Sequence, residues 1–310
     1  MFEAPTMGAE RAAEKGENVK INLMFIRHGE RTKKGELTDY GRQETMERAE
    51  ISPLTQEEFD AVKSMGSPAG PKSTVEGSEI ETMSRATETA HIFGSKIAEL
   101  TGSEEFETRN RPALSFETVK NKMPYNHTAI YNSLLPENFE TLSDEEKAVA
   151  AAKAQASTVN HLMNLDTPEA IAYKQEVAGA YSYTISHYAE MAERLKAGSK
   201  VLMPTGVHSP MMEVFLQKAL VRKDAEGNAI TGFTDVAEIG GEFGPSEGYS
   251  VNIETDENGQ LKPLGISFSN EARPKGEMYL DPEAIKELAD AYKELHKDEK
   301  IYQENPEVQA

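Results

Sequence analysis

Residues 19–30 read VKINLMFI-RHGE and give the first strong structural signal in the chain. The residues up to Ile26 are apolar and rich in β-formers, which is typical of a buried strand. A second run of this kind, KVLMPT at 200–205, leads into Gly206-Val207-His208. Ligand sites of open α/β sheets collect at the carboxyl ends of strands, so we expect His28 and His208 to share a site.

Helical patterns separate these strands and indicate an α/β chain. Helices are predicted from Thr38, over 55–66 as a short helix, and from Ser84, Ser143, Thr167 (to about 197), Ser209 with Pro210 as first helical residue, and Asp281. Further strands are predicted over 74–82 and as a hairpin, 249–253 and 261–268. We predict one domain over 19–300, in which about 120–195 form a largely helical insertion. Residues 1–18 are interpreted as a flexible lead-in and 301–310 as a tail.

Composition excludes several classes of function. The chain has 310 residues, 38% of them hydrophobic, and a formal charge of −20. That charge disfavours nucleic acid and anionic membrane surfaces as partners, because both would be repelled. The absence of cysteine excludes disulfides, thiolate metal sites and cysteine nucleophiles. No apolar run approaches the roughly 18 residues of a membrane span, and the N-terminus lacks a signal-peptide pattern, so a cytoplasmic location is expected, although a trimmed leader would permit secretion.

Cations gather around the two histidines in this acidic chain. Arg27 precedes His28, and Arg85 falls in the first turn of the helix predicted from Ser84. The helix start predicted after His208 offers free N–H groups and a positive dipole end. These features together predict a basic pocket for a small phosphorylated substrate.

Four motifs, in this order, resemble the histidine phosphatase superfamily, which has the phosphoglycerate-mutase-like fold. They are Ile26-Arg27-His28-Gly29-Glu30, Leu37-Thr38-Asp39-Tyr40-Gly41, Ser84-Arg85-Ala86-Thr87-Glu88-Thr89-Ala90 and Gly206-Val207-His208. The resemblance implies a three-layer α/β/α sandwich with a helical cap, and phosphoryl transfer through a phosphohistidine without metal or cofactor. His28 would be the nucleophile, Arg27 and Arg85 would bind the phosphate, and His208 would bind it and stabilise its transition-state charge.

The resemblance also requires a carboxylic acid that protonates the leaving oxygen. Its expected place after the second arginine indicates Glu117, and Ser209 occupies the position where another branch of the superfamily carries an aspartate. Three other glutamates compete for this role: Glu81, Glu238 and Glu242. Arg31 and Ser209 are further candidates for contact with the substrate.

The function that these residues favour is phosphomonoester hydrolysis. A phosphoglycerate-type mutase is the alternative enzyme, but the start RHGERTKK lacks the asparagine that the mutases carry. A phosphate-binding protein with little turnover is the alternative from another class. The remaining histidines show no metal-ligand spacing, so no metal site is predicted.

Overall fold

The computed structural model describes residues 16–75, 82–224 and 226–299, and places nine strands in one sheet. The strand order is β5-β2-β6-β1-β9-β10-β11-β7-β8. These strands are β1 (Lys20–Arg27), β2 (Ala61–Gly66), β5 (Glu105–Asn110), β6 (Lys200–Val207), β7 (Leu220–Lys223), β8 (Ala229–Thr231), β9 (Gly248–Glu254), β10 (Gly265–Phe268) and β11 (Tyr279–Leu280). A separate antiparallel pair consists of β3 (Lys72–Thr74) and β4 (Thr82–Ser84).

The sheet is parallel from β5 through β2 and β6 to β1, and turns antiparallel at β9. Parallel strands buried on both faces need apolar side chains on both, as the runs in β1 and β6 supply. In β1, Leu23 and Phe25 enter the core on one face, whereas Met24 and Ile26 enter the smaller core on the other. This alternation confirms the two central strands.

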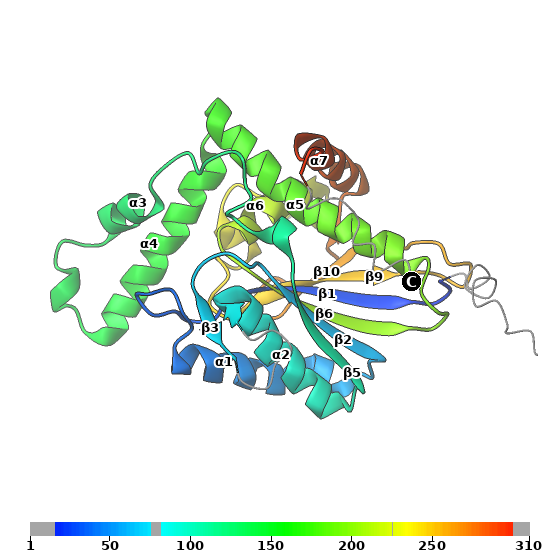
Figure 1. Ribbon diagram of the computed structural model, residues 1–310. Coiled ribbons are helices and arrows are strands. Elements are labelled where there is room, and N and C mark those ends of the chain that lie inside the picture. The colour runs from blue at the N-terminus through cyan, green and yellow to red at the C-terminus, as the bar shows by residue number, and fades with distance from the viewer. Residues whose placement is uncertain (1–15, 76–81, 225, 300–310) are drawn as a thin grey trace, which may run out of the picture.

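Helices cover both faces, which confirms the predicted three-layer α/β/α class (Figure 1). α1 and α2 pack on one face, and α5, α6 and α7 pack on the other. The α-helices are α1 (Asp39–Glu50), α2 (Arg85–Thr101), α3 (His127–Leu134), α4 (Asp144–Asn164), α5 (Pro168–Ala192), α6 (Met211–Ala219) and α7 (Pro282–Leu295). The described residues also form the short 3-10 helices η1 (Pro53–Gln56), η2 (Pro112–Leu114), η3 (Phe139–Thr141) and η4 (Val236–Ile239).

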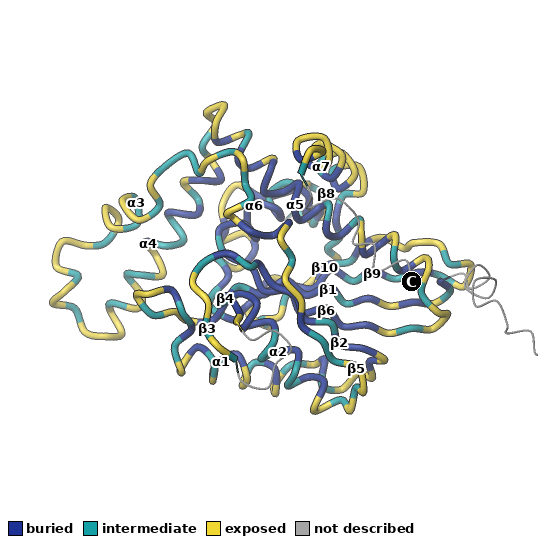
Figure 2. Tube along the Cα trace, in the orientation of Figure 1, coloured by how far each residue is buried: buried dark blue, intermediate teal, exposed yellow. Residues whose placement is uncertain are grey.

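The helical insertion is narrower than the expected 120–195. Figures 1 and 2 show α3 and α4 projecting past one end of the sheet with much exposed surface. α5 instead lies along the sheet and buries Val177, Tyr181 and Ile185 in the main core. The projecting cap therefore consists of α3 and α4, while α5 belongs to the sandwich.

The helix predicted over 55–66 is wrong. Only η1 forms there, capped by Ser52, and Ala61–Gly66 is strand β2 between β5 and β6. Pairing on both sides satisfies every backbone group of a central strand, and this outweighs the local capping pattern at Thr55. Part of the strand predicted over 74–82 lies outside the described residues; the described ends of that segment form the β3–β4 pair.

The chain termini are described in part. Residues 1–15 of the expected lead-in and 300–310, which include the tail, lie outside the described residues. Gly16 and Asn18, which we assigned to the lead-in, are hydrogen-bonded to Glu193 and Asp256. Within 16–75, 82–224 and 226–299, no helix combines the length and apolar character needed to cross a membrane.

Candidate active site

The register between β1 and β6 brings the two histidines together. Arg27 pairs with Val207 across these parallel strands, so His28 and His208 follow at the same height. The backbone N–H of His28 donates to Val207 O at 3.0 Å. The two imidazole rings lie with their centroids 5.1 Å apart at 63°. The predicted juxtaposition at the strand ends is therefore present.

A hydrogen bond sets the tautomer of His28. Its Nδ1 lies 2.8 Å from Gly29 O, and a carbonyl oxygen can only accept, so Nδ1 carries the proton. Nε2 then holds the free lone pair of a neutral imidazole. Burial, followed by the charge of Arg85, lowers the pKa of His28 to about 3. The ring is neutral at physiological pH and has the electronic form that a nucleophile requires.

The depressed pKa of His28 predicts a loss of stability in acid. An unfolded His28 takes up a proton below its ordinary pKa of 6.5, whereas the folded protein resists protonation down to about 3. Protons therefore favour the unfolded chain within this range, so stability falls as pH falls. In urea unfolding at pH 7 and pH 5, we expect wild type to lose about 2 kcal/mol more than His28→Ala. Equal losses in the two proteins would contradict the depressed pKa.

Close packing places Arg85 at the same edge. Gly66 and Gly206 are paired at the ends of β2 and β6, and the first turn of α2 lies directly on them. A Cβ on Gly206 would come within 1.8 Å of Ala86 O, so only glycine permits this approach. The helix predicted from Ser84 is confirmed as α2: Ser84 caps it by accepting from Thr87 N, and Arg85 is the first helical residue.

The guanidinium of Arg85 lacks a carboxylate partner among the described residues. Its Nη1 donates weakly to Gly35 O at 3.4 Å, and its buried Nε has no hydrogen-bond partner there. Burial, followed by the charge of Arg31, lowers its pKa to about 10. A cation held in this way has donors available for an anionic ligand.

Two more arginines contribute positive charge. Arg27 Nη1 donates to Phe243 O in a short hydrogen bond, and it lies 4.0 Å from Glu242 Oε1. Arg31 is exposed, and its charge reaches His28, Arg85 and His208. The structure thus brings the predicted cations together around the histidine pair.

His208 is buried under an aromatic ring. The Phe116 ring meets it edge-on, with centroids 5.0 Å apart, and neither nitrogen of His208 has a hydrogen-bond partner among the described residues. Burial, followed by His28 and the arginines, lowers the pKa of His208 well below its ordinary value. Unpartnered buried polar atoms are rare in native proteins and point to a missing ligand or water.

The structure contradicts the predicted helix cap at Ser209 and places Glu117 near Arg85. The Ser209 hydroxyl donates to Glu213 Oε1 at 3.1 Å, and α6 begins at Met211 without a side-chain cap, so the expected Ser209 N-cap is wrong. Glu117 is exposed, and its Oε1 accepts from Gly70 N at 3.0 Å. A Cβ on Gly70 would lie 3.0 Å from Arg85 Nη1, which places Glu117 on the Arg85 side of the site.

The three competing acids, Glu81, Glu238 and Glu242, differ in their positions relative to the site. Glu81 lies outside the described residues. Burial by itself would raise the pKa of Glu238. Hydrogen bonds from the backbone N–H groups of Asp235 and Thr234 outweigh this effect and lower the pKa to about 2. Glu242 is the one of the three that approaches a predicted site residue, Arg27, among the described parts of the chain.

Sequence reasoning missed Phe116, Glu213 and Thr89. Thr89 accepts from Gly29 N and donates to Arg85 O, which joins α2 to the His28 loop. Its place in the SRATETA motif was the available signal. Phe116 had no such signal, because it contacts His208 from a distant segment, and the bond of Glu213 to Phe243 likewise joins segments far apart in the chain.

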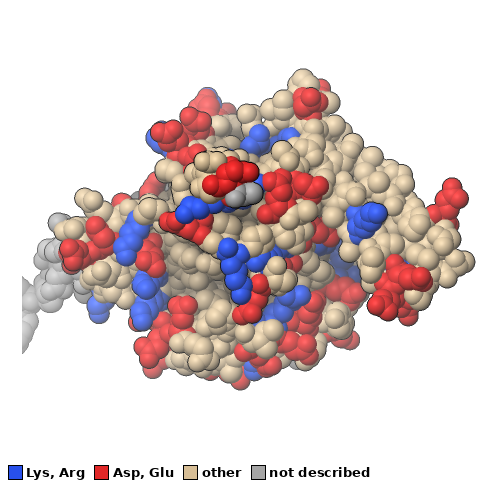
Figure 3. Space-filling model, turned by 180° about the vertical axis from the view of Figure 1, so that it is seen from behind, with Lys and Arg blue, Asp and Glu red and all other residues tan. Residues whose placement is uncertain are grey.

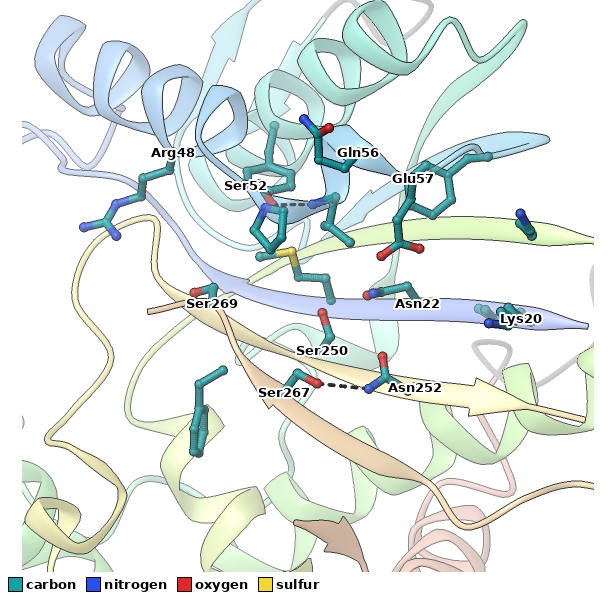
Figure 4. Close-up of a pocket in the computed structure, with 18 of the residues that line it drawn as sticks. Lys20, Asn22, Arg48, Ser52, Gln56, Glu57, Ser250, Asn252, Ser267 and Ser269 are labelled. Atoms are coloured by element: carbon teal, nitrogen blue, oxygen red, sulfur yellow. Dashed lines mark hydrogen bonds between the residues drawn. The ribbon is translucent and has the colours of Figure 1, made fainter. Parts of the chain in front are cut away.

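A cavity of about 1010 Å³ lies elsewhere, between α1, η1 and one face of β1, β9 and β10 (Figure 4). Its floor carries amides and hydroxyls, including Asn22, Ser250 and Asn252, whose Nδ2 donates to Ser267 Oγ. None of the predicted site residues lines it. The cavity is therefore separate from the histidine pair.

The wider surroundings are mixed in charge. Figure 3 shows acidic side chains scattered among basic ones over the face in view. Within the parts of the chain that are described, no group of three or more His, Asp or Glu residues is placed to hold a metal ion.

Comparison with known proteins finds likeness only among solved structures. No protein-family model and no curated protein matches the chain. A mycobacterial glucosyl-3-phosphoglycerate phosphatase in its native form matches at 14% identity and TM-score 0.30, over 80% of this chain and 96% of that chain. Its VO3 complex matches at 15% identity and TM-score 0.27, over 74% and 92%. A structure described as mycobacterial hydrolase 1 matches at 13% and 0.27, over 80% and 96%. At these scores none of the three indicates an activity for this chain.

Proposed function

We propose that this chain is a phosphomonoester hydrolase of the histidine phosphatase type, with His28 as its nucleophile. The observation that carries the proposal is the neutral His28, whose Nδ1–H is held by Gly29 O beside His208 and three arginines. A free Nε2 lone pair needs no deprotonation before it attacks phosphorus. The surrounding cations would attract the dianionic phosphate and stabilise the charge on its oxygens in the transition state.

The reaction would proceed in two balanced steps. His28 Nε2 forms a bond to phosphorus while the bond to the ester oxygen breaks, and that oxygen leaves with the electron pair and takes a proton. Water then attacks the phosphohistidine and loses a proton, the N–P bond breaks, and inorganic phosphate departs. Arg27 and Arg85 would hold the phosphoryl oxygens through both steps. Glu117, beside the Arg85 loop, and Glu242, beside Arg27, are the candidate carboxyl groups for this proton.

A screen against phosphorylated metabolites tests this proposal. Wild type should release inorganic phosphate from at least one of them, and His28→Ala serves as the blank.

Excess EDTA should leave the rate of phosphate release unchanged. A loss of rate that Mg²⁺ or Zn²⁺ restores would contradict the metal-free mechanism. Exchange of phosphate between two substrates instead of its release would indicate the mutase. Inorganic phosphate that raises the melting temperature without any turnover would indicate the binding protein.

A further inference from the structure

The side chain of Glu242 is set in a loop that other residues hold firmly. Arg273 is 4% exposed and donates to three carbonyl oxygens of this loop, those of Ile239, Gly241 and Glu242. Its Nε also donates to Glu247 Oε1 at 2.6 Å, and its guanidinium lies 4.1 Å from the centre of the Phe243 ring. A buried cation with these partners leaves the backbone at Glu242 little freedom.

A second set of contacts joins the same loop to both histidine strands. Phe243 O accepts from Arg27, the residue before His28. Phe243 N donates to Glu213 Oε1 at 3.0 Å, and that oxygen also accepts from Ser209, the residue after His208. The position of Glu242 is therefore coupled to both ends of the catalytic pair.

The carboxyl of Glu242 is largely buried and only partly paired. Its side chain is 15% exposed, and Oε1 lies 4.0 Å from Arg27 Nη1, at the outer limit of an ion pair. Oε2 is buried without a hydrogen-bond partner among the described residues. Both ring nitrogens of His208 and Nε of Arg85 are likewise buried without a hydrogen-bond partner among the described residues. The oxygens of a bound phosphate ester would accept from Arg85 Nε, from the protonated ring nitrogen of His208 and from a protonated Glu242.

The surroundings favour the protonated form of this carboxyl. Burial has the largest effect, and with the nearby charge of Glu213 it raises the pKa of Glu242 to about 7. Arg27, Arg273 and a hydrogen bond with Gln155 of α4 act in the opposite direction. A carboxyl that is partly protonated near neutral pH can serve as both acid and base. Glu117, in contrast, is exposed and already accepts a hydrogen bond from a backbone N–H.

We propose that Glu242, and not Glu117, protonates the leaving oxygen and afterwards accepts the proton of the attacking water. The inference rests on the proposed phosphohistidine mechanism. In the first step the proton of Glu242 passes to the ester oxygen as the P–O bond breaks. In the second step its carboxylate takes a proton from water, whose oxygen bonds to phosphorus as the N–P bond breaks. Each turnover thus restores the protonated Glu242 and the neutral His28.

The test compares Glu242→Gln with the matched variant Glu117→Gln on an alkyl phosphate and on nitrophenyl phosphate. Gln keeps the size of the side chain but cannot donate this proton. An alkoxide is a poor leaving group that needs a proton, whereas nitrophenolate is a good one. Glu242→Gln should therefore slow the phosphorylation of His28 by the alkyl ester about 10²–10⁴-fold, and its phosphorylation by nitrophenyl phosphate much less. Glu117→Gln should instead slow the two esters by the same factor, because the loss of a group that does not protonate the leaving oxygen is independent of the leaving group. The pre-steady-state burst of each protein measures the phosphorylation step directly.

Two outcomes overturn the assignment. Equal slowing of both esters by Glu242→Gln would mean that Glu242 only positions Arg27. A leaving-group-dependent loss in Glu117→Gln would transfer the acid role to Glu117. In both cases wild type still forms the acid-labile phosphohistidine, so the proposed function stands. If wild type forms no phosphohistidine, the proposed function itself fails. A retained burst with nitrophenyl phosphate shows that Glu242→Gln is folded.

Discussion

His28→Ala is expected to lower phosphomonoester turnover by at least about 10⁴-fold, because no other group supplies the nucleophile in the proposed mechanism. Steady-state phosphate release measures the loss. Wild type quenched during turnover should carry an acid-labile, base-stable phosphate, and His28→Ala should carry none.

The matched control is His91→Ala. His91 is a partly buried histidine on α2 whose Nδ1 hydrogen-bonds Thr108, away from the site. Its replacement should leave turnover within about twofold of wild type. Label found on a serine, or substantial turnover by folded His28→Ala, would rule out His28 as the nucleophile.

Arg85→Met should lower kcat/KM by about 10³-fold and abolish protection by inorganic phosphate. Methionine keeps an unbranched apolar stem but removes the charge and the donors. The same change should raise the melting temperature of the unliganded protein by about 1–3 °C. In the folded protein Arg85 is partly buried, lies near Arg31 and has no carboxylate partner among the described residues. Burial and the charge of Arg31 lower its pKa to about 10, so the charged Arg85 destabilises the folded state. Functional sites commonly hold charged groups in arrangements that lower the stability of the folded protein.

Thermal unfolding with and without inorganic phosphate measures both effects. Arg194→Met is the control. Arg194 is exposed just after α5, and its Nε donates to Glu190 O within the same segment. It should retain wild-type activity and phosphate protection. An Arg85→Met protein that phosphate still protects as strongly as wild type would show that Arg85 does not bind the phosphate.

The parts of the fold that follow short-range rules could be predicted. Thr38 and Ser84 each cap a helix through a bond to an N–H three residues ahead, and such patterns are visible in the sequence. The runs before His28 and His208 are apolar on both faces, which identifies central strands. β2 escaped prediction because its acidic lead-in resembles a helix start, while its pairing partners are far away in the chain.

The sequence by itself determined which histidines and arginines meet at the candidate site. His28, Arg27, Arg85 and His208 stand directly at strand ends or in a helix's first turn, and local geometry carries each to the same sheet edge. Only the tertiary structure decided how the carboxylates are arranged. Glu242 lies in a loop without regular structure, held by Arg273, by Glu213 and by Arg27 from β1. A carboxyl's burial and charged neighbours depend on such distant contacts, and no local pattern encodes them.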